Sequence, residues 1–168
     1  ALGSAAGSTS VVACDGGDAS EAAALVALAR PAGVLHAAGL LVDRLLQRLA
    51  ASTVASPFAP KAVGAAHLHA STSMGRVQAL VLFSSVASAT GNAGQANYAA
   101  ANACLDALAT SRRTRGIAAA SVQWGAWAEV GMAARGAASE RMAAMESASG
   151  FGRIGLAHGL GALHGAVL

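Results

Sequence analysis

The chain has 168 residues, of which 11% are charged and 55% hydrophobic, and its formal net charge is +3. This length allows one domain or part of one, with enough apolar content to bury a core. The basic cluster at residues 112–115 follows a predicted helix and complements its dipole, so we expect no nucleic-acid partner. The uncharged run at 77–105 contains too many serines and asparagines for a membrane span.

The cysteines and histidines do not form a recognisable metal pattern. Cys14 and Cys104 have neither the spacing of metal ligands nor that of a secreted disulfide framework. The N-terminal residues do not have the basic and apolar regions of a signal peptide. We therefore expect no metal and a cytoplasmic location.

In the first part of the chain, we expect two strands and two helices. Strands are predicted at 10–15 and 33–39, and helices at 17–30 and 40–50. The first strand is a β-branched run that ends in Asp15. Ser20 is a plausible N-cap for the helix that follows, and Pro31 ends that helix.

Two prolines separate this part from the next helix. Pro57 and Pro60 are predicted to break the helical region that begins at residue 40. A new helix is then expected at 61–71, with Lys61 in its first turn.

The second part of the chain continues the alternation. Strands are predicted at 79–84 and 118–126, a loop at 86–94, and helices within 94–116, near 137–148 and near 156–167. Alternating strands and helices predict a parallel sheet with helices on both faces, in a doubly wound fold. Because ligands bind beyond the carboxyl ends of such strands, one sheet edge should collect the residues of interest. These strand ends are Asp15, residues 37–39, Ser84 with Ser85, and Trp124 with Gly125.

Four side chains suggest chemistry at that edge. Tyr98 is the only tyrosine and Lys61 the only lysine, while Ser85 ends a predicted strand. Asn102 lies one helical turn after Tyr98, on the same face. An ammonium beside a phenol favours the phenolate, which makes the phenol a usable proton donor. Taken singly, however, a helical tyrosine is usually a packing residue and a lone lysine a surface charge.

The spacing of these four residues and the motifs around them resemble those of the short-chain dehydrogenase/reductase family. More specifically, it resembles the ketoreductase domain of modular polyketide synthases. The matching segments are HAAG (36–39), APKAVGAAHLH (59–69), LFSSVASATGNAGQANYAAANACLDALA (82–109) and VQWGAWAEVGMA (122–133). The resemblance implies a Rossmann-like fold and places the family's catalytic tetrad on Ser85, Tyr98, Lys61 and Asn102.

The resemblance also implies a reaction, a cofactor and partners. It implies NADPH-dependent reduction of a β-ketoacyl thioester on an acyl carrier protein, within a polyketide synthase and beside its other domains. Tyr98 would donate the proton and Ser85 would bind the carbonyl. Lys61 would favour the phenolate and bind the nicotinamide ribose, and Asn102 would anchor a water or Lys61 for reprotonation. Residues that would line the cofactor are Asp15, Ala37, Ala38, Gly39, Lys61 and Tyr98, and tight packing is an equal alternative for 37–39.

A glycine-rich phosphate-binding turn after a strand is not recognisable at the start of the sequence. Against the family pattern, residues 1–168 therefore form a single partial domain in which the first strands are missing, and we expect the chain alone to be inactive. One alternative is a non-catalytic reductase-like scaffold within a megasynthase. Another is a free-standing short-chain reductase.

The configuration of the product is a further expectation from the resemblance. Ketoreductases that form one configuration of the alcohol carry Leu-Asp-Asp just after the HAAG-like turn, where this chain has Leu41, Val42 and Asp43. Those that form the opposite configuration carry a tryptophan at the position of Thr90, although Gln95 is more typical of that group. On balance these residues favour the D-configured alcohol. In the alternative interpretation, Asp43 merely caps or solvates the helix at 40–50.

Overall fold

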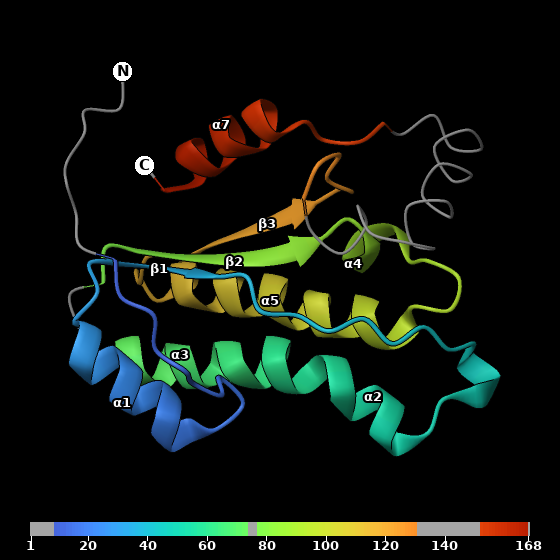
Figure 1. Ribbon diagram of the computed structural model, residues 1–168, viewed down its shortest axis with the longest axis horizontal. Coiled ribbons are helices and arrows are strands. Elements are labelled where there is room, and N and C mark those ends of the chain that lie inside the picture. Colours follow the sequence, from blue (N-terminus) through green and yellow to red (C-terminus); the bar gives the residue numbers. More distant parts are fainter. Residues whose placement is uncertain (1–8, 74–76, 131–151, 168) are drawn as a thin grey trace.

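The computed structural model describes residues 9–73, 77–130 and 152–167, which fold around a parallel sheet. Its strands, in the order β1-β2-β3, are β1 (Gly33–His36), β2 (Ala79–Ser85) and β3 (Ala120–Trp124). The register aligns His36 with Leu82 and Ser85 with Trp124. The carboxyl ends of all three strands therefore lie at the same edge of the sheet, as predicted (Figure 1).

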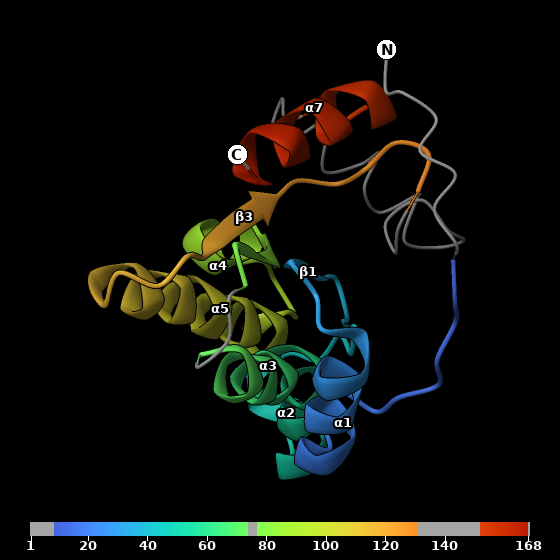
Figure 2. The ribbon, with the colours of Figure 1, turned by 90° about the vertical axis from the view of Figure 1, so that its left-hand side faces the viewer.

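Helices cover both faces of this sheet. They are α1 (Ala19–Ala29), α2 (Ala51–Phe58), α3 (Gly64–Thr72), α4 (Ala87–Thr90), α5 (Ala96–Thr114) and α7 (Leu156–Val167), with the short turns η1 (Leu46–Arg48) and η2 (Ala59–Val63). Helices α5, α3 and α1 lie on one face, and α7 lies on the other (Figures 1 and 2). The predicted doubly wound α/β fold is confirmed.

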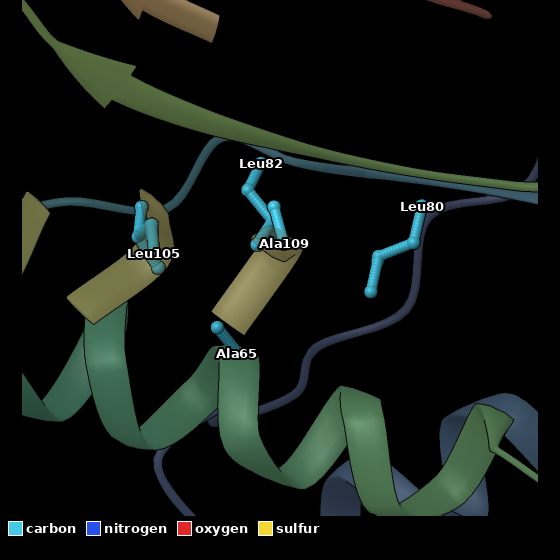
Figure 3. Packing of buried hydrophobic residues seen from close by; sticks show 5 residues of the cluster. All are labelled: Ala65, Leu80, Leu82, Leu105 and Ala109. Atoms are coloured by element: carbon cyan, nitrogen blue, oxygen red, sulfur yellow. The ribbon is translucent and has the colours of Figure 1, made fainter. Parts of the chain in front are cut away.

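The core lies between β2 and the helices beneath it. Leu80 and Leu82 point from β2 toward α5 and α3, where Leu105, Ala109 and Ala65 receive them (Figure 3). All five side chains are fully buried. Alanine at two of these positions lets the helices approach the sheet closely.

The predicted strand at 10–15 is wrong. These residues form no strand, and Val11 and Val12 are exposed. Among the described residues no strand lies beside this segment or beside the free edge of β1. Since a strand needs a hydrogen-bonding neighbour, β-branched composition alone does not produce one.

The predicted helix at 40–50 is also largely wrong, because only the single turn η1 forms there. The chain before η1 is instead bonded to the segment that leads into α5. Arg44 N donates to Gly94 O over 2.8 Å, and Asn97 Nδ2 donates to Val42 O over 3.0 Å. Contacts with residues distant in the sequence therefore override the local preference for a helix at 40–50.

Helix α1 forms where it was predicted, but its N-cap is Asp18 and not Ser20. The Asp18 carboxylate accepts from the backbone N–H groups of Ser20 and Glu21. Ser20 contributes a hydroxyl bond to the same carboxylate. At the other end, Arg30 adopts the left-handed conformation, with φ of 43°, just before Pro31.

Pro57 and Pro60 do not break the chain into two helices, so the predicted break at these prolines is wrong. Helix α2 continues through the π-helical turn η2 into α3 without interruption. Pro57 cannot donate to the carbonyl of Thr53, one turn earlier. Asn97 Nδ2 donates to that carbonyl instead, over 2.7 Å. A side chain from α5 thus replaces the missing helical bond and holds α2 against α5.

The remaining elements agree with the sequence, apart from details. The strands predicted at 79–84 and 118–126 and the helices within 94–116 and near 156–167 are confirmed. The loop at 86–94 contains the short helix α4. The helix expected near 137–148 lies outside the described residues. Within the described parts of the chain, no helix has both the length and the apolar character to cross a membrane.

The bond from Asn97 to Thr53 generates a stability prediction. Asn97→Ala should lower the free energy of unfolding of the 168-residue chain by about 1–3 kcal/mol, because the carbonyls of Val42 and Thr53 lose the donor that the buried Asn97 provides. In a Pro57→Ala background the same change should cost less, since the new alanine supplies the helical N–H that proline lacks. Urea unfolding followed by circular dichroism measures both costs. Equal costs in the two backgrounds would contradict this account.

Candidate active site

Lys61 lies at the centre of the candidate site. It lies in the π-helical turn η2 and is only 3% exposed. Its Nζ donates to Phe83 O over 2.9 Å, and it lies over the ring of Tyr98, 5.4 Å from the ring centroid. The structure therefore brings the only lysine and the only tyrosine of the sequence together.

The turn after β1 holds Lys61 from another side. The buried His36 donates from Nε2 to the backbone carbonyl of Lys61 over 3.1 Å. Burial lowers the pKa of His36 and thereby favours a neutral ring, although the hydrogen bond to Lys61 acts in the opposite direction. A Cβ atom at Gly39 would lie 3.0 Å from Lys61 Cε, so the lysine stem fills the space that a side chain would need. Gly39 thus has a packing role beside Lys61.

Asn102 lies directly behind Tyr98 on α5. It is fully buried, and its Nδ2 donates to the carbonyl of Tyr98 over 2.8 Å. Its Oδ1 is buried and has no partner within the described residues. A buried acceptor of this kind is a place where an ordered water binds.

Ser85 joins this group through the end of β2. Its hydroxyl accepts from Ala87 N over 3.2 Å at the start of α4. The two residues before it contact the other members: Phe83 O binds Lys61 Nζ, and Ser84 Oγ donates to Asn102 O over 3.3 Å. The predicted residues Ser85, Tyr98, Lys61 and Asn102 are therefore contributed by neighbouring elements at one sheet edge.

The other predicted cofactor-lining residues are exposed, and of these Gly39 packs against Lys61. Ala37, Ala38 and Gly39 follow β1 and are exposed. Asp15 is exposed too, in a turn where its carboxylate accepts from Gly17 N over 2.8 Å. This turn lies beside α3, because Gly16 O is bonded to His67 Nδ1 at 3.2 Å.

Burial sets the charge state of Lys61. Removal of its ammonium from water lowers the pKa of Lys61 to about 8, while the negative charge of Asp106 acts in the opposite direction. At neutral pH the lysine remains mainly protonated, although its pKa lies only slightly above that pH. Near neutral pH its charge thus depends on the groups around it.

Sequence reasoning missed two residues of this site, His36 and Asp106. The Asp106 carboxylate accepts hydrogen bonds from Ser88, Ser121 and Gln123. Asp106 is the only acidic residue between Asp43 and Glu129, and it follows Asn102 by one helical turn. That lone acid at helical spacing was a readable signal. The sequence contained no such signal for His36, because its hydrogen-bond partner is the backbone carbonyl of Lys61, which no residue type marks.

The residues considered for stereochemistry also come together. Gln95 Nε2 donates to Asp43 Oδ1 over 3.1 Å, and Asn92 Nδ2 donates to Gln95 Oε1 over 3.0 Å. No regular helix forms at 40–50, so the interpretation of Asp43 as the cap of that helix is wrong. The configuration of the product stays a prediction.

In the described residues no cluster of histidine, cysteine and acidic side chains could hold a metal ion.

The sequence is similar to that of known synthases. The model of the KR domain family matches residues 2–129. Polyketide synthase GfsB of Streptomyces halstedii is 48% identical over 136 residues, which is 79% of this chain and 2% of that protein. Mycoketide-CoA synthase of Mycobacterium tuberculosis is 43% identical over 130 residues, which is 75% of this chain and 3% of that protein.

Solved structures show the same likeness. The first ketoreductase of the tylosin polyketide synthase has a TM-score of 0.82 and 42% identity, covering 91% of this chain and 33% of that structure. An A1-type ketoreductase has a TM-score of 0.86 and 38% identity, with coverage of 94% and 33%. The chain thus spans about a third of the length of these solved ketoreductases.

The lowered pKa of Lys61 predicts how stability depends on pH. Lys61→Met should stabilise the chain at pH 7 by about 1–3 kcal/mol, since the buried charge is removed. The pKa of Lys61 is lowered from 10.5 to about 8 in the folded state, so the unfolded chain binds more protons between those values. The stability of the unmutated chain should therefore rise with pH across that window, and the advantage of the variant should shrink.

Urea unfolding at pH 7 and near pH 10 measures this effect. The exposed Arg48 provides a control, because Arg48→Met adds the same side chain without removing a buried charge. A difference between Lys61→Met and the unmutated chain that did not change with pH would contradict the assignment.

Proposed function

This chain belongs to the KR domain family of polyketide synthases, and we propose that it forms the catalytic part of a β-ketoacyl reductase. The reaction is reduction of the β-keto group of an acyl thioester to a hydroxyl group. The observation that carries this proposal is the position of Lys61 Nζ over the ring of Tyr98, with Asn102 one turn behind. A scaffold without catalytic function would not need a buried, costly ammonium at this place.

The side chains divide the chemistry among them. Tyr98 donates its phenolic proton to the ketone oxygen, and Lys61 stabilises the phenolate that remains. Ser85 donates a hydrogen bond to the same oxygen and stabilises the negative charge that develops there. The unpartnered Oδ1 of Asn102 holds a water, through which the phenolate regains its proton from solvent.

The exposed turn after β1 fits a nicotinamide cofactor. Ala37, Ala38 and Gly39 present small side chains and backbone to solvent, and Gly39 lies against Lys61, whose ammonium would bind the ribose hydroxyls. Asp15, in the turn before α1, would contact the adenine end. Bound NADPH supplies the hydride that reduces the carbonyl carbon. The work of the protein here is to hold Lys61 and Tyr98 beside that position.

The relatives suggest the form of the substrate. They are polyketide synthases, in which we expect the β-ketoacyl chain to be carried by the phosphopantetheine of an acyl carrier protein. The partners are then that carrier protein and the other domains of the synthase. We place this assembly in the cytoplasm.

Tyr98→Phe tests the proton donor, in a ketoreductase domain that contains residues 1–168. Turnover of a simple β-ketoacyl thioester should fall at least about 100-fold, because the phenolic proton is lost. NADPH affinity should remain nearly unchanged, since the ring and its contact with Lys61 are kept. Lys61→Ala, by contrast, should weaken both cofactor binding and turnover. Near-normal turnover in Tyr98→Phe would rule out the assignment.

The isolated chain should bind NADPH only weakly, because the sequence shows no glycine-rich turn for the pyrophosphate. Titration by calorimetry or by nucleotide fluorescence measures the affinity of residues 1–168. Micromolar binding would contradict this prediction and would indicate a phosphate site elsewhere in the chain.

A further inference from the structure

A network of side chains around Asp106 lies behind the candidate site. Asp106 Oδ2 accepts from Ser88 Oγ over 2.7 Å and from Gln123 Nε2 over 2.8 Å. Asp106 Oδ1 accepts from Ser121 Oγ over 2.5 Å. One carboxylate on α5 thus holds donors from α4 and from β3.

The contact with Ser88 leads directly to the catalytic end of β2. Ser88 Oγ also lies 2.8 Å from the backbone oxygen of Ser85. Ser85 is the last residue of β2, and its own hydroxyl accepts from Ala87 N at the start of the same helix. The single hydroxyl proton of Ser88 is shared between Ser85 O and Asp106 Oδ2, so Ser88 connects the turn that carries the Ser85 hydroxyl to α5.

Helix α5 also carries the proton donor. Tyr98, Asn102 and Asp106 follow one another at intervals of four residues, so they lie along one face of the helix. An anchor from Asp106 to Ser88 thus joins the two elements whose separation decides whether Ser85 and Tyr98 reach the same ketone oxygen.

We propose that Asp106 is a positioning residue for the reduction proposed above, and the inference rests on that proposed function. Through Ser88 its carboxylate fixes the Ser85 turn relative to the α5 helix that bears Tyr98. It acts on the reaction without touching the substrate. Misplacement of a catalytic group by about 1 Å can cost about 100-fold in rate, so such an anchor has a measurable effect.

The charge of Asp106 gives the same residue a second effect. Although burial acts to raise the pKa of Asp106, the hydrogen bonds from Ser121, Ser88 and Gln123 outweigh it and lower that pKa. The carboxylate is therefore ionised at neutral pH, and its charge favours the ammonium form of Lys61. Within the described residues, the other titratable groups beside Lys61 are Tyr98, whose ring lies under Nζ, and His36, whose pKa is lowered by burial.

Three variants of the ketoreductase domain that contains this chain test the proposal. Ser88→Ala removes the link to Ser85. Ser121→Ala is the matched control, because it removes one hydroxyl donor from the same carboxylate but does not touch α4. Asp106→Asn keeps the shape and removes the charge. Each variant is measured for kcat and KM with NADPH and a β-ketoacyl thioester, for its pH–rate profile, and for thermal unfolding.

We expect Ser88→Ala to lower kcat about 10-fold with little change in the KM for NADPH, and Ser121→Ala to stay within about threefold. The two should lose similar thermal stability. Asp106→Asn should lower kcat at least as much as Ser88→Ala. It should also move the alkaline limb of the pH–rate profile to lower pH, because Lys61 loses the charge that favours its ammonium form.

Two outcomes would overturn the proposal. In the first, kcat falls in Ser88→Ala and Ser121→Ala only in proportion to their lost stability. In the second, Asp106→Asn keeps the kcat and the pH profile of the unmutated domain while Tyr98→Phe is inactive, so that the inference fails and the proposed function survives. An unmutated domain that reduced no β-ketoacyl thioester with NADPH would remove both.

Discussion

The burial of one positive charge is the constraint on which this site depends. Lys61 is 3% exposed, and an ammonium removed from water is stable only if surrounding groups compensate. The carbonyl of Phe83 and the ring of Tyr98 face its Nζ, and Asp106 supplies a favourable charge. Because these groups come from β2 and α5, the position of the lysine fixes how these elements meet.

The helical run from α2 to α3 has the conformation that this constraint requires. Pro60 lies at the start of the π-helical turn η2, whose wider winding accommodates a residue that cannot donate a helical bond. Lys61 follows immediately, with His36 bonded to its carbonyl and Gly39 packed on its stem. The prolines therefore shape the turn that presents the lysine, and Asn97 repairs the helical bond that Pro57 removes.

Helix α5 connects the candidate catalytic residues to the rest of the fold. The Asn97 side chain binds the carbonyls of Val42 and Thr53. Further along the helix, the backbone carbonyl of Asn102 accepts from Ser84 and the carboxylate of Asp106 accepts from Ser88. Polar side chains on the buried face of a helix reduce its amphipathic signal. In α5 such side chains position the candidate catalytic residues, while the apolar residues of the helix pack against the sheet.

The sequence alone indicated the parallel sheet and most of its elements, and it predicted Ser85, Tyr98, Lys61 and Asn102 as candidate site residues, which the fold brings to one sheet edge. Helical spacing, strand ends and uncommon residue types are local signals, and the sequence motifs that resemble the family support them. Tertiary structure alone decided the rest. Among the described residues no strand lies beside 10–15. Arg44 bonds to Gly94 just before α5, and Asn97 supplies the hydrogen bond that Pro57 cannot make. Each of these outcomes depends on hydrogen bonds between residues far apart in the chain, which local propensity does not encode.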